Sequence, residues 1–77
     1  MLVIYQAGAD AHVDDPLGGF LSTDELRQRD GFVMRNLGGV YGPLVWNLAG
    51  GYQVEPDGSI PKVLEIHRNT LNEMMSL

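Results

Sequence analysis

The chain has 77 residues, enough for one small domain, and its lack of cysteine excludes disulfides and thiolate metal sites. Ten acidic residues against five basic ones give a net charge of −5, which argues against binding to the phosphate backbone of nucleic acids. No apolar run approaches the about 20 residues of a membrane span, and no basic stretch precedes the apolar run at residues 1–5 as it would in a signal peptide. We therefore expect a cytoplasmic protein that binds neither nucleic acid nor a membrane.

The first half of the chain predicts a strand, a loop and a helix. Residues 2–6 are apolar without alternation, which is typical of a strand buried on both faces. The Asp-Pro and Gly-Gly pairs within residues 13–20 exclude regular structure there. A helix should begin after Ser22, because Ser22 with Glu25 three residues later matches the capping box, and the glycine pair at 38–39 should end it.

The second half repeats the order of strand and helix. Residues 43–48 predict another buried strand, a glycine-rich turn follows at 49–52, and Pro61 suits the first turn of a helix that continues to the C-terminus. Two strands that flank a single helical crossover should be parallel. The sequence therefore predicts an α/β fold, a βαβα fragment of a doubly wound parallel sheet, with residues 1–77 as a single small unit.

The predicted strands carry apolar residues toward both faces of the sheet, and two helices cannot cover both faces well. This mismatch is the first indication that the unit belongs to a larger domain or needs a partner. We expect either a missing N-terminal portion or self-association into a homo-oligomer.

Polar residues follow both predicted strands, at the edge where open parallel sheets place their ligands. Asp10 and His12 come after the first strand, and Tyr52 follows Gly50 and Gly51 after the second. Asp and His are metal ligands, and a Tyr hydroxyl can donate a hydrogen bond to a developing oxyanion. Each also has a plain interpretation, as a turn residue for Asp10, an exposed loop residue for His12 and a packing residue for Tyr52.

Two motifs stand in order at a spacing typical of one enzyme family. The first is Gly-Ala-Asp at 8–10 followed by Asp-Pro-Leu-Gly at 15–18, and the second is Leu-Ala-Gly-Gly-Tyr at 48–52. Together they resemble the C-terminal part of the histone deacetylase and acetylpolyamine amidohydrolase family, which has the arginase-deacetylase fold. The resemblance covers residues 2–52, and residues 53–77 are similar to the closing helix of bacterial members in a less distinctive way.

The resemblance implies a role for four residues. Asp10 matches the second zinc-binding aspartate of the family. Tyr52 matches the tyrosine that polarises the amide carbonyl and stabilises the tetrahedral oxyanion. Gly50 and Gly51 match the glycines that shape the wall of the substrate pocket beside it.

For three further polar residues we expect roles other than catalysis. His12 matches no metal ligand of the family, although the pair that it forms with Asp10 would bind a divalent ion weakly. Asp15 matches an acidic residue of the motif, to which we assign a loop-organising role. His67 lies mid-helix, and we expect it on the far side of the chain as a packing or capping residue.

The family's mechanism also needs a His-His pair as general acid and base and an upstream Asp-x-His pair of zinc ligands, and neither has a counterpart here. We therefore expect the C-terminal segment of a zinc-dependent deacetylase-like amidohydrolase. It should be inactive alone, bind Zn²⁺ weakly or not at all, and act on an acetylated amide only within the complete enzyme. The alternative is a non-catalytic α/β module that self-associates or binds a protein partner.

Overall fold

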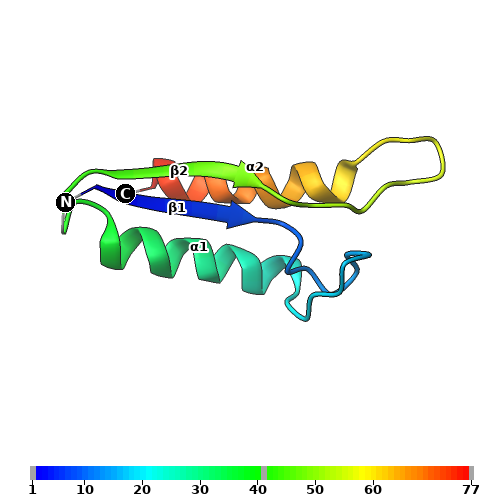
Figure 1. The fold of residues 1–77 in the computed structure, drawn as a ribbon, viewed down its shortest axis with the longest axis horizontal. Coiled ribbons are helices and arrows are strands. Elements are labelled where there is room, and N and C mark those ends of the chain that lie inside the picture. The colour runs from blue at the N-terminus through cyan, green and yellow to red at the C-terminus, as the bar shows by residue number, and fades with distance from the viewer. Residues whose placement is uncertain (1, 41, 77) are drawn as a thin grey trace.

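A computed structural model of the chain describes residues 2–40 and 42–76 (Figure 1). Its elements are β1 (Val3–Gly8), α1 (Thr23–Leu37), β2 (Leu44–Ala49) and α2 (Pro61–Met75). The two strands pair in parallel, so the predicted α/β fold with βαβα order is confirmed. Neither described helix has the length and apolar character needed to span a bilayer.

Both strands extend further toward their carboxyl ends than the apolar runs predict. The pairing runs from Val3 opposite Leu44 to Gly8 opposite Ala49, and the Ala9 N–H then donates to the Ala49 carbonyl at 2.9 Å. Main-chain hydrogen bonds do not depend on apolar side chains, so the small residues at 7–9 and 49 continue the pairing. The two strands therefore stay paired up to the turns that carry the polar residues.

Helix α1 begins and ends where the sequence predicts. The Ser22 hydroxyl accepts from the Glu25 N–H at 3.1 Å and the Glu25 carboxylate accepts from the Ser22 N–H at 2.9 Å, which completes the capping box. The Gly38 N–H donates to the Met34 carbonyl, and Gly39 follows with φ of +76°, a value that ends a helix readily only at glycine.

Both helices pack on one face of the sheet and against each other (Figure 1). Fully buried apolar side chains lie between these layers: Ala7, Ala9, Leu26, Met34, Val63 and Ile66. On the opposite face, Ile4 is 70% exposed and Val45 is 51% exposed. The expectation that the strands are buried on both faces is therefore wrong for this chain by itself, because both of its helices lie on the same side.

Candidate functional site

The carboxyl ends of β1 and β2 bring Asp10 against Gly50. A Cβ atom added to Gly50 would lie 2.5 Å from Oδ1 of Asp10, and one added to Gly8 would lie 2.7 Å from the same oxygen. Non-bonded atoms do not approach this closely, so the Asp10 carboxylate can lie here only because Gly8 and Gly50 have no side chain. We call these two glycines the glycine cradle. The turns after the two strands are thus packed together, and the Asp10 carboxylate lies at their junction.

Gly50 and Gly51 also need their backbone freedom. Their φ angles are +60° and +101°, in the region that side chains other than glycine rarely adopt. A Cβ on Gly51 would lie 2.8 Å from Val63 of α2 and 3.1 Å from Ala9. The two glycines therefore let the chain after β2 turn close to both β1 and α2, and their place in a substrate pocket stays a prediction.

Tyr52 comes immediately after this turn and is 49% exposed. Its main-chain N–H donates to Oδ2 of Asp15 at 2.8 Å. Among the described residues, no side chain or carbonyl forms a hydrogen bond with its hydroxyl. The hydroxyl is therefore available to a ligand, whereas the main chain is held in place.

Asp15 has the loop-organising role expected from the sequence. It is 5% exposed, and its Oδ1 accepts from the Leu17 N–H at 2.9 Å while Oδ2 accepts from Tyr52. One carboxylate thus joins the loop after β1 to the turn after β2. The sequence motif indicated the first contact but not the second.

His12 is a structural residue of the same loop, and its interpretation as an exposed residue is wrong. It is 6% exposed, its Nδ1 accepts from the Asp14 N–H at 3.1 Å, and its Nε2 lies 2.9 Å from the Thr23 hydroxyl. Because Nδ1 accepts, the ring proton belongs on Nε2, which donates to Thr23. Both nitrogens are occupied, so His12 has no free lone pair to bind a metal alongside Asp10 in this arrangement.

His67 lies beside the turn after β2, so its expected place on the far side of the chain is wrong. Burial lowers the pKa of His67 below its ordinary value, while the neighbouring Gly50 main chain acts in the opposite direction. Its Nδ1 is buried without a hydrogen-bond partner in the described part of the chain. The side chain lines a hollow of about 300 Å³ between β2 and α2, together with Trp46 and Leu64.

A buried polar cluster under the sheet is absent from the sequence predictions. Asp30 is 0% exposed, and its Oδ1 accepts from the Tyr5 hydroxyl at 2.5 Å and from Nη2 of Arg29 at 2.9 Å. Its Oδ2 accepts from the Thr70 hydroxyl at 2.5 Å, and Nη1 of Arg29 donates to the Gly8 carbonyl at 2.8 Å. Burial and the hydrogen bond to Asp30 raise the pKa of Tyr5 above its ordinary value. The cluster ties β1, α1 and α2 together.

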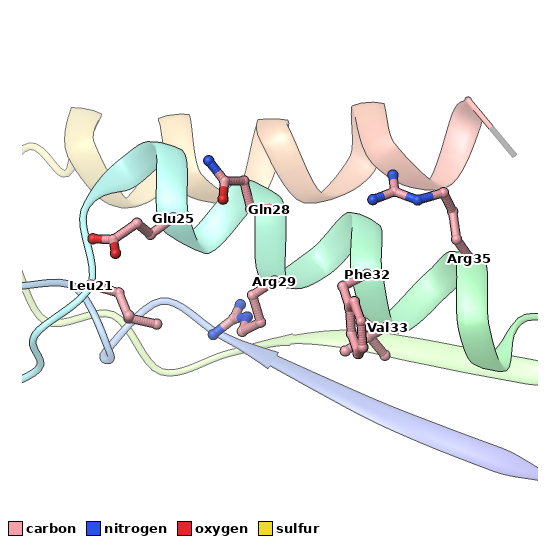
Figure 2. A pocket seen from close by; sticks show the side chains of 7 residues that line it. All are labelled: Leu21, Glu25, Gln28, Arg29, Phe32, Val33 and Arg35. Atoms are coloured by element: carbon pink, nitrogen blue, oxygen red, sulfur yellow. The ribbon is translucent and has the colours of Figure 1, made fainter.

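A larger hollow, of about 540 Å³, is lined by side chains of α1 and by Leu21, which precedes that helix (Figure 2). The lining residues within α1 are Glu25, Gln28, Arg29, Phe32, Val33 and Arg35. It includes neither Asp10 nor Tyr52. It is therefore separate from the edge formed by the turns after β1 and β2, which carry these two residues and which we call the strand-end edge.

The strand-end edge fits a metal ion only in part. Asp10 offers a carboxylate that the glycine cradle places, but residues 2–40 and 42–76 hold no group of three His, Asp or Glu side chains close enough to bind one ion. A catalytic zinc usually has three protein ligands and one open position. The described residues therefore do not form a complete zinc site by themselves.

No family model matches the chain, and no curated protein or solved structure is similar to it at a significant level. The resemblance to the deacetylase family accordingly rests on the sequence motifs.

Proposed function

We propose that the chain is the C-terminal segment of a zinc-dependent deacetylase-like amidohydrolase, which acts in the cytoplasm on an acetylated amide. The observation that carries the proposal is the junction of the two strand-end turns. There the Asp10 carboxylate packs against Gly50, two residues before a half-exposed Tyr52 whose hydroxyl has no partner in the described chain. The resemblance to the deacetylase family assigns zinc binding to Asp10 and oxyanion stabilisation to Tyr52.

Asp10 is the residue of this chain that would hold the zinc ion. When bound, zinc polarises an acyl carbonyl and lowers the pKa of a water molecule that attacks it. The part of this chain is to place the carboxylate, through the cradle formed by Gly8 and Gly50. The remaining ligands and the general base belong, in this proposal, to a portion of the enzyme outside the described residues.

Tyr52 would donate its hydroxyl proton in a hydrogen bond to the oxygen on which negative charge develops. Preorganised donors of this kind act mainly on the transition state, and removal of one lowers kcat by about 10²–10³. A free, half-exposed hydroxyl on a fixed main chain suits this role, because the group can meet substrate without first breaking an internal hydrogen bond. Gly50 and Gly51 would form the adjoining wall of the pocket.

The test begins with the DNA upstream of the Met1 codon. We predict that this DNA encodes the His-His and Asp-x-His segments. The upstream-encoded segment and residues 1–77, expressed as one chain and called the joined polypeptide below, should release acetate from an acetyl-lysine peptide or an acetylpolyamine in a zinc-dependent manner. The 77-residue chain alone should show no turnover. Upstream DNA without these segments would contradict the proposal, as would a joined polypeptide whose activity is unchanged by Tyr52→Phe.

The open face of the sheet favours a second function, a non-catalytic module that self-associates or binds a protein partner. Ile4 and Val45 are large, apolar and more than half exposed on that face, and exposed apolar patches favour association. Sedimentation equilibrium of the 77-residue chain should then show a concentration-dependent dimer or larger species. A monomer at high concentration with a cooperative melt would contradict self-association.

A further inference from the structure

We infer that Asp15 is a positioning residue, which fixes the main chain of Tyr52 relative to the turn that carries Asp10. The functional meaning of this contact rests on the function proposed above, because Tyr52 matters for catalysis only there. The contact itself is independent of that proposal. It joins two loops that the sheet alone does not hold together.

Tyr52 lies beyond the reach of the strand pairing. The paired residues end at Gly8 and Ala49, with one further hydrogen bond from Ala9 to Ala49. Gly50 and Gly51 then intervene with positive φ angles. Glycine restricts the backbone least of all residues, so two in succession cannot by themselves fix the direction in which the chain continues.

Asp15 provides the missing restraint at the first residue after the glycines. Its buried Oδ2 accepts from the Tyr52 N–H at 2.8 Å, and 37 positions separate the two residues in the sequence. Hydrogen bonds to a charged acceptor are stronger than neutral ones, and a buried carboxylate without its donors would be costly. Both oxygens of Asp15 are engaged, since Oδ1 accepts from the Leu17 N–H.

The loop that carries Asp15 is itself braced, so the restraint has a firm base. The Asp15 N–H donates to the His12 carbonyl at 3.0 Å, and the His12 ring bonds to Thr23 in the first turn of α1. The Ala11 carbonyl accepts from the N–H groups of residues 20 and 21, and a Cβ on Gly19 would lie 2.0 Å from that oxygen. A continuous set of contacts thus runs from α1 through His12 and Asp15 to Tyr52.

His12 and Asp15 both hold the loop after β1 in place. His12 follows Asp10 at the spacing of a metal pair, yet its nitrogens brace the loop. Asp15 sits in the same loop and points its second oxygen to the other turn. The separation between Asp10 and the Tyr52 main chain is therefore set by side-chain contacts in addition to the sheet.

The experiment uses NMR on the 77-residue chain labelled with ¹⁵N and ¹³C. A scalar coupling across the hydrogen bond, from the Tyr52 amide nitrogen to the Asp15 carboxyl carbon, should be detectable in the wild type. In Asp15→Asn the side-chain amide places an N–H₂ group against one of the two main-chain donors, so one hydrogen bond is lost. Amide exchange at Tyr52 or Leu17 should become about 10- to 100-fold faster, while the amides of Ala9 and the strands change little.

Asp14→Asn is the matched control, because it removes the same charge from the neighbouring, exposed position. It should leave Tyr52 exchange within about twofold of wild type. If Asp15→Asn unfolds the chain, the wild-type coupling still decides the matter. No coupling in the wild type, or exchange at both Tyr52 and Leu17 that is equal in the two variants, would overturn the inference.

The result also separates this inference from the proposed function. Measured coupling with an active joined polypeptide that tolerates Tyr52→Phe would leave the positioning contact intact and contradict the catalytic role. Absence of the coupling, with loss of activity in Tyr52→Phe, would contradict the positioning role alone. In the joined polypeptide, Asp15→Asn should lower kcat with little change in KM, whereas Asp14→Asn should change neither.

Discussion

The molecule contains two polar clusters, one around Asp30 beneath the sheet and one around Asp10 and Tyr52 at the strand-end edge. They differ in whether their side chains find hydrogen-bond partners within the chain. Beneath the sheet, both carboxylate oxygens of Asp30 accept hydrogen bonds from this chain's own side chains, and no part of the residue is exposed. At the strand-end edge, Asp10 has no hydrogen-bond donor to its carboxylate among the described residues, and Tyr52 presents a free hydroxyl. The first cluster stabilises the fold, whereas the second is the one to which the proposed function assigns a ligand.

The two clusters are linked through Arg29 and Gly8. Arg29 pairs with Asp30 and donates to the Gly8 carbonyl, and Gly8 forms part of the cradle around Asp10. The buried cluster therefore supports the end of β1 from below. Changes in it should therefore lower the stability of the fold first.

The largest expected effect comes from Asp30→Ala. This change removes the acceptor for Tyr5 and Thr70 and leaves the Arg29 charge without its partner. Breaking a buried pair in this way costs about 3–5 kcal/mol, which is a large share of the stability of so small a domain. Urea unfolding followed by circular dichroism measures the loss. Asp24→Ala, on the exposed side of α1, should cost under about 1 kcal/mol, and equal losses would remove the distinction between the two clusters.

A smaller effect is expected from Gly50→Ala, compared with Gly58→Ala. Both positions have positive φ, so both variants carry a similar backbone cost of about 1–2 kcal/mol. Only at Gly50 does the new Cβ meet another group, Oδ1 of Asp10, whereas nothing lies within 4 Å at Gly58. Gly50→Ala should therefore be the less stable variant and should shift the Asp10 side-chain resonances. Identical melts and unchanged Asp10 signals would mean that the cradle is not formed.

Tyr5→Phe tests the buried cluster through pH. The pKa of Tyr5 is raised in the folded chain, so in the unfolded chain the hydroxyl loses its proton first, near pH 10. The stability that Tyr5 contributes is complete below that pH and is lost as the pH rises above it. Urea unfolding at pH 8 and pH 11 should show a steeper decline for wild type than for Tyr5→Phe. Parallel declines would contradict the burial of this hydroxyl.

The smallest effect concerns His67 at acidic pH. Its pKa is lowered in the folded chain by burial, so the unfolded chain takes up a proton first as the pH falls below about 6.5. Stability should therefore decrease between pH 7.5 and pH 5.5, and the decrease should be smaller in His67→Gln. Unfolding curves at the two pH values measure the difference, and a decrease of the same size in both proteins would place His67 in solvent.

The sequence predicts the element order well because its signals are local. The capping box at Ser22 and the glycines after α1 act within a few residues, and the structure places them as expected. The buried cluster is harder to predict, because a charged residue at a helical position is usually exposed. Asp30 nevertheless lies four residues after Leu26 and four before Met34, both buried, and this spacing could have indicated that it faces inward.

The residues assigned to the candidate site remain a prediction from the sequence motifs, and the contacts that hold them in the structure are ones the sequence does not indicate. Motif positions indicate Asp10 and Tyr52, whereas the contact from Asp15 to the Tyr52 main chain joins residues 37 positions apart. The position of His67 beside Gly50 likewise follows from how α2 packs on the sheet. Such contacts depend on tertiary packing, for which a single sequence offers no local signal.

The most direct measurement compares Tyr5→Phe with Tyr52→Phe in the joined polypeptide, at a temperature where both variants are folded. Each variant loses one hydroxyl, the first from the cluster that satisfies itself and the second from the strand-end edge. We predict that Tyr5→Phe lowers stability by about 1.5–3 kcal/mol and keeps the deacetylase activity that we propose for the joined polypeptide. Tyr52→Phe should keep its stability and lose about 10²–10³ in kcat. Full activity in Tyr52→Phe, or a loss of activity confined to Tyr5→Phe, would contradict the catalytic role proposed for Tyr52.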